Sequence, residues 1–202
     1  MPEKNINPIK QEKDLLRAQY KARRAAVSPE DQKLRDAAIC RVAAGLVSFR
    51  YAEYVLLYAP IEGEVDISAL AQKALDTGKK IAFPRCCKEK HTMEYHVVSS
   101  MDDLRVDSYG IREPTPEAPM YDVKGSGACA VCFVPGLVYD GDGYRLGYGK
   151  GFYDRYLSAF SGSSVGVVYS DFVIPRVPRG RFDAKVDVIL TEKSVIVPKP
   201  AK

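Results

Sequence analysis

The segment best suited to chemistry is residues 145–157, with the sequence RLGYGKGFYDRYL. Its three glycines, Gly147, Gly149 and Gly151, let the backbone approach a ligand closely. They come just before a predicted helix, whose start carries unpaired N–H groups and a partial positive charge. With Arg145 before the loop and Lys150 inside it, the segment predicts an anion-binding site. It is neither a Walker loop, because no Ser or Thr follows Lys150, nor a dinucleotide fingerprint.

Asp154 falls in the first turn of that helix and has two interpretations. A carboxylate there complements the helix dipole, which is worth a few tenths of a kcal/mol. It could instead bind Mg²⁺, which takes one or two carboxylates together with phosphate oxygens and water. Asp183 is the candidate for a second carboxylate, and Asp187 could be either a ligand or a polar residue at a strand edge.

A basic stripe runs along the first predicted helix, residues 9–27. Its cations recur every three or four residues and therefore share one face of a helix. A solvated face normally mixes positive and negative charges at four-residue spacing, and the stripe has no such pairs of its own. It is therefore expected to face an anion. The stripe consists of Lys10, Lys13, Arg17, Lys21 and Arg24.

The rest of the chain alternates short apolar runs with helical patterns. A second helix begins at residues 28–31, where Ser28 suits the cap and Pro29 the first turn. Another is expected at 67–78, ended by Gly78, and a last one at 151–160. Strands are expected at 53–59, 79–84 (stopped by Pro84), 92–98, 128–134, 165–169 and 186–192. This order predicts a three-layer α/β/α sandwich with a largely parallel central sheet, in which ligands bind at the carboxyl ends of the strands. The loops at 61–66 and 135–151 belong to that edge.

Composition limits the class of protein. The chain has 202 residues, 46% of them hydrophobic, and a net charge of +4. That predicts one domain, residues 1–202, and gives little support for nucleic-acid binding. No apolar run approaches the ~20 residues of a membrane helix, and the first residues lack the apolar core of a signal peptide. The expected location is the cytoplasm, without a membrane partner.

The cysteines and histidines offer weaker candidates. An odd number of cysteines, five, argues against a disulfide framework. Cys129 and Cys132 have a CxxC spacing, which Cys86–Cys87 could complete as a zinc site, but residues 128–134 are better explained as a buried strand. His91 and His96 are expected to be surface or packing residues.

The segment VPGLVYDGDGYRLGYGKGFYDRYL resembles the signature of the 5-formyltetrahydrofolate cyclo-ligase family, whose members are also called methenyltetrahydrofolate synthetases. Other segments are similar to the family's basic helix, its folate-site loop and two further motifs, so the resemblance covers nearly the whole chain. These segments are residues 13–17 with Lys21 and Arg23, residues 64–66, 84–85 and 110–114. Two departures stand out: Phe182 precedes Asp183 where the family often has His, and the chain has no tryptophan to stack on a pterin.

The resemblance implies ATP-dependent cyclisation of 5-formyltetrahydrofolate to 5,10-methenyltetrahydrofolate, with release of ADP and phosphate. The γ-phosphoryl group would move to the formyl oxygen, and folate N10 would then attack the activated carbon. Lys150 and Arg145 are the catalytic candidates, and Asp154 and Asp183 would bind Mg²⁺. Glu64, Phe152 and Tyr153 would contact the folate, which can carry a polyglutamate tail. The ATP-binding candidates are Lys13, Arg17, Arg145, Gly147, Tyr148, Gly149, Lys150, Gly151, Phe152 and Tyr153. The expected assembly is a monomer or weak homodimer.

Two alternative functions remain open from the sequence alone. Another enzyme on a similar sheet, such as a sugar-phosphate isomerase or a CoA-handling protein, could use the phosphate loop without hydrolysing ATP. A nucleic-acid binder could use the basic stripe, and its affinity would then fall steeply with salt.

Overall fold

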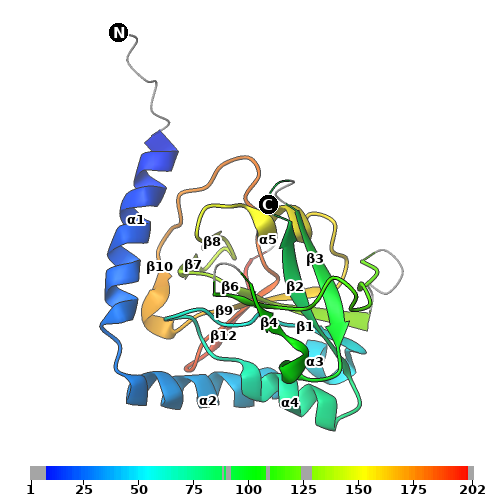
Figure 1. The fold of residues 1–202 in the computed structure, drawn as a ribbon. Coiled ribbons are helices and arrows are strands. Elements are labelled where there is room, and N and C mark those ends of the chain that lie inside the picture. Colours follow the sequence, from blue (N-terminus) through cyan, green and yellow to red (C-terminus); the bar gives the residue numbers. More distant parts are fainter. Residues whose placement is uncertain (1–7, 88, 90–91, 108–109, 124–128, 200–202) are drawn as a thin grey trace.

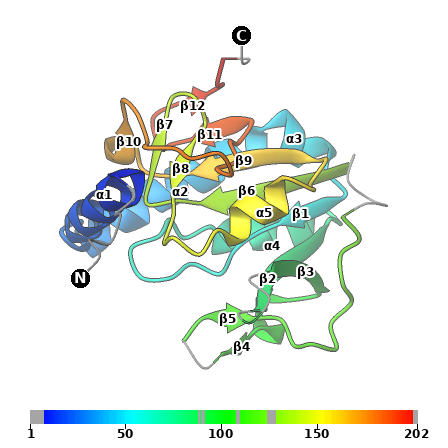
Figure 2. The same cartoon turned by 90° about the horizontal axis from the view of Figure 1, so that it is seen from above.

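The computed structural model describes residues 8–87, 89, 92–107, 110–123 and 129–199. Its centre is a seven-stranded sheet in the order β12-β11-β9-β6-β1-β2-β3 (Figures 1 and 2). The four inner pairings are parallel, and the two outer ones, β11 with β12 and β2 with β3, are antiparallel. The prediction of a mainly parallel sheet is confirmed. The strands are β1 (Tyr54–Leu56), β2 (Lys80–Cys87), β3 (Thr92–Val98), β6 (Ala130–Pro135), β9 (Ser163–Val167), β11 (Val188–Leu190) and β12 (Val195–Ile196).

Helices cover both faces of this sheet. α2 (Pro29–Gly45), α3 (Val47–Tyr51) and α4 (Ser68–Asp76) lie on one face, while the short α5 (Phe152–Leu157) lies on the other (Figure 1). α2 begins as expected, with the Ser28 hydroxyl accepting a hydrogen bond from the Asp31 N–H at 3.2 Å. α1 (Pro8–Ala25) covers neither face of the sheet and lies at one side of it (Figure 2).

Two predictions about strands were wrong. Pro84 does not stop its strand, because β2 continues to Cys87 and pairs with β3 from Ile81 to Cys87. In addition, the segment expected as an exit loop after β6 contains paired strands of its own. β7 (Val138–Asp140) and β8 (Arg145–Leu146) form a hairpin, and β10 (Val173–Ile174) adds a third strand to it. The remaining elements are β4 (Arg105–Val106) paired with β5 (Arg112–Glu113), η1 (Met101–Asp103) and η3 (Ser170–Phe172).

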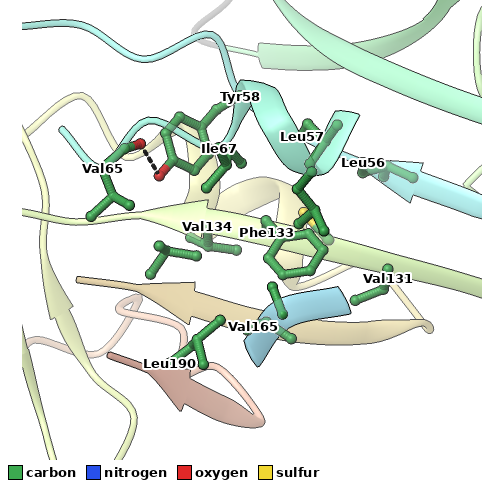
Figure 3. Close-up of a cluster of buried hydrophobic side chains, with 14 of the residues drawn as sticks. Leu56, Leu57, Tyr58, Val65, Ile67, Val131, Phe133, Val134, Val165 and Leu190 are labelled. Carbon is green, nitrogen blue, oxygen red and sulfur yellow. Dashed lines mark hydrogen bonds between the residues drawn. The ribbon is translucent and has the colours of Figure 1, made fainter. Parts of the chain in front are cut away.

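The core is built on the inner strands, whose apolar side chains are buried on both faces. β6 is the clearest case, since Val131, Cys132, Phe133 and Val134 are fully buried. This is the pattern expected of a central parallel strand. Figure 3 shows this cluster and the Tyr58 hydroxyl, which donates to the Val65 carbonyl at 2.8 Å. That bond ties the loop after β1 to the core and so fixes a segment of the functional site.

Candidate active site

A cavity of about 400 Å³ opens beside the carboxyl ends of β1 and β6. Every residue predicted for the site lines it, although these residues come from α1, the loop after β1, the segment from β8 into α5, and the loop before β11. The parallel sheet explains this, because it brings its strand exits to one edge. The predicted residues are Lys13, Arg17, Glu64, Arg145, Gly147, Tyr148, Gly149, Lys150, Gly151, Phe152, Tyr153, Asp154 and Asp183.

The glycine loop needs its glycines for two different reasons. Gly149 and Gly151 have φ values of +91° and +68°, a region that side chains with a Cβ rarely adopt. A Cβ on Gly149 would also lie 3.1 Å from the guanidinium carbon of Arg17. Arg17 reaches this position from α1 and donates from Nε to the Gly147 carbonyl at 2.9 Å. The helix and the loop are therefore in direct contact.

Two cations of the site are held by the two predicted metal ligands. Lys13 Nζ lies 2.6 Å from Asp183 Oδ2, and Arg145 Nη2 lies 2.9 Å from Asp154 Oδ1. Arg145 also donates to the Ala184 carbonyl at 3.1 Å, and its side chain is only 4% exposed. Positive and negative groups therefore neutralise each other in the cavity.

Lys150 differs from the other cations. Its side chain is exposed at the cavity edge, and within the described part of the chain its Nζ has no ion pair or hydrogen bond. Its backbone carbonyl accepts from Arg155 Nη2 at 2.7 Å, which fixes the main chain while leaving the ammonium free. Lys150 is therefore available to an incoming anion without breaking an existing contact.

The carboxylates suit a divalent cation that is shared with a second ligand. Asp154 Oδ1 accepts from the Ala184 N–H at 3.1 Å, which places it beside Asp183. Each carboxylate keeps one oxygen, Oδ2 of Asp154 and Oδ1 of Asp183, that accepts no bond from the described residues. No group of three or more His, Cys, Asp or Glu residues there could hold a metal by itself. Two hard oxygen donors fit Mg²⁺ only when phosphate and water complete the shell.

Asp187, the alternative ligand, has a structural role. Its Oδ2 accepts from the backbone N–H and the hydroxyl of Ser164 in β9, at 2.8 and 2.7 Å. It does not line the cavity. The interpretation as a polar residue at a strand edge is the one that the structure supports.

Glu64 differs from the other carboxylates of the site in its raised pKa. It follows Gly63 in the loop after β1, where its Oε2 accepts from the Ile61 N–H at 3.3 Å. Burial raises the pKa of its carboxyl to about 7, although this hydrogen bond and the positive charge of Arg24 oppose the shift. Glu64 can therefore exchange between neutral and ionised forms near neutral pH, as is common for groups in functional sites.

Much of the remaining lining of the cavity is apolar, and only Phe152 and Tyr153 of it were predicted to contact the folate. Residues 84–85 and 110–114 carry no predicted role, because nothing in a short strand or loop shows which way its side chains point. The additional wall residues are Tyr58, Ala59, Ile61, Pro84, Cys86, Met93, Ile111, Arg112, Glu113, Pro135 and Leu146.

The basic stripe needs a correction. It was expected to have no acidic partner of its own, but Asp14 Oδ1 lies 2.5 Å from Arg17 Nη1, three residues away on the same helix. The spacing of three, rather than four, was overlooked. Lys13 and Arg17 nevertheless line the cavity, while Arg24 is buried deeper.

The minor candidates do not join the site as catalysts. His96 is buried, and its Nδ1 lies 2.7 Å from the Ala118 carbonyl, as expected of a packing residue. His91 lies outside the described residues. Cys132 is buried in β6, as the strand interpretation predicted, and burial raises the pKa of its thiol.

Fold and site together define an α/β protein with one cavity that is lined by a phosphate-type anion site and by apolar side chains. The model of the 5-formyltetrahydrofolate cyclo-ligase family matches residues 9–192. The chain therefore belongs to this family.

Individual relatives agree. The chain is 25% identical over 202 residues to a probable 5-formyltetrahydrofolate cyclo-ligase of Caenorhabditis elegans, covering 95% of this chain and 98% of the relative. It is 30% identical to the enzyme of that name from Mycolicibacterium smegmatis, covering 71% and 75%. The solution structure of Aquifex aeolicus 5,10-methenyltetrahydrofolate synthetase superposes with a TM-score of 0.80 at 34% identity, covering 94% of each chain.

Proposed function

We propose that this protein catalyses the ATP-dependent cyclisation of 5-formyltetrahydrofolate to 5,10-methenyltetrahydrofolate, releasing ADP and phosphate. The observation that carries the proposal is that two kinds of groups line one cavity. A glycine loop with cations and carboxylates suits phosphate, while a titratable carboxylate, Glu64, and apolar side chains suit a heterocycle. This arrangement suits a reaction that brings a triphosphate to a flat heterocycle.

The glycine loop and α1 bind the triphosphate. The backbone of residues 147–151 lies against the phosphates, while Lys13 and Arg17 neutralise their charge from α1. When Mg²⁺ is bound by Asp154, Asp183 and phosphate oxygens, it adds further positive charge. The catalytic work of such a transfer is mostly positioning and charge neutralisation, so no protein nucleophile is needed.

The chemistry then has two steps. The formyl oxygen attacks the γ-phosphorus, ADP departs, and an imidate phosphate forms on the folate. The ammonium of Lys150, which has no other partner among the described residues, stabilises the negative charge of the phosphoryl group as that group moves. Arg145 stabilises the same charge from a fixed position. Folate N10 then attacks the activated carbon and gives up its proton to water or to the departing phosphate, and phosphate leaves with the former formyl oxygen.

Glu64 and the aromatic residues orient the folate. The Glu64 carboxylate accepts hydrogen bonds from N–H groups of the substrate, and Phe152 and Tyr153 enclose its rings. A closed apolar wall also excludes water, which would otherwise hydrolyse the activated intermediate.

The test combines two measurements on purified protein. Absorbance of the methenyl product should rise only when ATP, Mg²⁺ and 5-formyltetrahydrofolate are all present, and one phosphate should be released for each product formed. Turnover without ATP, or ATP hydrolysis at a rate that does not depend on the folate, would overturn the proposal in favour of another enzyme on this fold.

We also propose binding partners, a location and an assembly state for the protein. Its partners are small molecules, ATP and 5-formyltetrahydrofolate with or without a polyglutamate tail, and it works in the cytoplasm as a monomer or weak homodimer. None of the helices in the described part of the chain has the length and apolar character to span a membrane. Sedimentation over a range of protein concentrations would test the assembly state.

A further inference from the structure

Arg24 is the buried cation that the proposed reaction does not use. It lies near the end of α1, and only 4% of its surface is exposed. A buried guanidinium is costly unless its charge and its N–H groups are used. Arg24 Nε and Nη1 make no hydrogen bond of good geometry among the described residues, although the Tyr148 hydroxyl lies close enough for Arg24 to lower its pKa.

The remaining nitrogen of Arg24 reaches the exit of β6. Nη2 donates to the carbonyl oxygens of Gly136 and Leu137, the latter at 3.1 Å. These residues connect β6 to the β7–β8 hairpin, which leads into the glycine loop. One side chain of α1 therefore fixes the segment that carries the phosphate site.

The stem of Arg24 supports a second segment. A Cβ built on Gly63 would lie 3.5 Å from Arg24 Cβ and 3.7 Å from its Cδ, so the backbone of the Glu64 loop rests on this side chain. Gly63 has a φ of +77°, which sets the direction in which the loop continues to Glu64. Arg24 also lines a second hollow together with Gly63 and Tyr148 of the glycine loop.

We infer that Arg24 is a positioning residue that joins the Glu64 loop to the exit of β6 and so orients Glu64 toward the folate. The inference rests on the proposed function, because it assigns Arg24 a role in folate binding by that same site. It gives α1 a part in holding Glu64 as well as in binding phosphate.

The positive charge of Arg24 opposes the rise in the pKa of Glu64. Burial raises the pKa of Tyr58, Tyr148 and Tyr153, so these neighbours are neutral at pH 7. Other cations, among them Lys13, Arg17 and Arg145, line the same cavity. Removing the guanidinium should therefore raise the pKa of Glu64. Fewer molecules would then carry the carboxylate at neutral pH.

The test compares Arg24→Met with Arg23→Met. The Arg23 guanidinium lies over the Phe172 ring at 5.4 Å, the same distance as that of Arg24. Arg23 is exposed, also lies over the Tyr20 ring at 4.9 Å, and among the described residues donates a hydrogen bond only to the Asp171 carbonyl. Arg24→Met should raise the KM for 5-formyltetrahydrofolate about tenfold and change kcat much less. The acid limb of kcat/KM should move up by about one pH unit. Arg23→Met should leave KM and the acid limb unchanged.

Three further readouts make the result decisive. The parent must first convert 5-formyltetrahydrofolate with ATP; if it does not, the proposed function fails, and Arg24 is not the cause. Calorimetric titration of 5-formyltetrahydrofolate should show weaker binding to Arg24→Met. If that variant does not fold, Arg24→Lys is measured in its place. It keeps the positive charge but loses the guanidinium group, so the acid limb of kcat/KM should stay at the parent's pH while KM rises. Parent-like KM and pH profiles in the folded Arg24 variant, or equal changes in Arg23→Met, would overturn the inference.

Discussion

At the scale of single residues, the cations of the cavity are of two kinds: those that already form ion pairs and those that do not. Lys13 and Arg145 hold carboxylates, whereas Lys150 is exposed and has no partner among the described residues. An ammonium without a protein partner gives up hydrating water when an anion arrives, but it breaks no ion pair. Lys150 is therefore the cation best placed to stabilise charge that develops only during phosphoryl transfer.

Lys150→Ala should accordingly reduce turnover with little effect on folding. We expect a loss of roughly 2–4 kcal/mol of transition-state stabilisation, the scale of one electrostatic contact to developing charge. The measurement is kcat/KM for product formation, with Lys73→Ala, an exposed lysine on α4, as the control. Activity within a few-fold of the parent would remove Lys150 from the mechanism.

Glu64 should make stability depend on pH in an unusual direction. Its pKa rises from 4.5 to about 7 on folding, so the folded state holds the proton more tightly than the unfolded state. The stability contributed by the protonated form is complete below pH 4.5 and is lost as pH rises through 7. Glu64→Gln, which cannot ionise, should therefore gain melting temperature relative to the parent more at pH 8 than at pH 5. An equal difference at both pH values would show that the pKa is not raised.

At the scale of elements, most of the site was predictable because its parts follow strands or begin helices. The glycine loop and the basic stripe of α1 were found from local patterns, and Glu64 from the family resemblance. The glycine loop, Glu64, Lys13 and Arg17 line one cavity, whereas the other three cations of the stripe do not. The ion pairs were not foreseen, because Lys13 meets Asp183 only through tertiary structure. The β7–β8 hairpin was missed for a related reason: its strands are three and two residues long, too short to show a periodicity.

Pro84 shows where a local rule fails. Proline lacks an N–H and is normally confined to strand edges and bulges. β2 nevertheless continues through it, with Pro84 paired to Tyr95 of β3 and lining the cavity. The sequence could show that proline was present but not that the neighbouring strands would continue past it.

α1 should act through its contact with the glycine loop. Arg17→Ala removes the bond to the Gly147 carbonyl and one positive charge from the cavity. We expect the KM for ATP to rise about tenfold while the melting temperature stays near that of the parent. Lys10→Ala is the matched control, because Lys10 shares the stripe but does not line the cavity. A variant that melts early with unchanged ATP affinity would reduce the stripe to a packing face.

At the scale of the whole molecule, the site is a set of charges that neutralise one another across distant segments. Lys13 of α1 holds Asp183 of the loop before β11, and Arg145 of β8 holds Asp154 of α5. A triphosphate attracts the cations, while a divalent metal attracts the carboxylates. Either ligand alone would leave one side of each pair without its partner. Together they replace both sides, so ATP and Mg²⁺ should bind with positive coupling.

This coupling predicts how the carboxylate variants behave. Asp154→Asn should keep the fold and lose most activity, and raised Mg²⁺ should partly restore it, because Asp183 and the phosphates still offer oxygens. Asp183→Asn should behave alike but more mildly. In the parent, ATP and Mg²⁺ together should raise the melting temperature by more than the sum of their separate effects, and this excess should shrink in both variants. Asp142→Asn, which breaks a surface ion pair with Arg179 outside the cavity, is the control and should keep the excess. If the Mg²⁺ dependence of activity and the thermal excess in both variants match the parent, these aspartates are not metal ligands, and Asp154 serves only the helix start and the Arg145 pair.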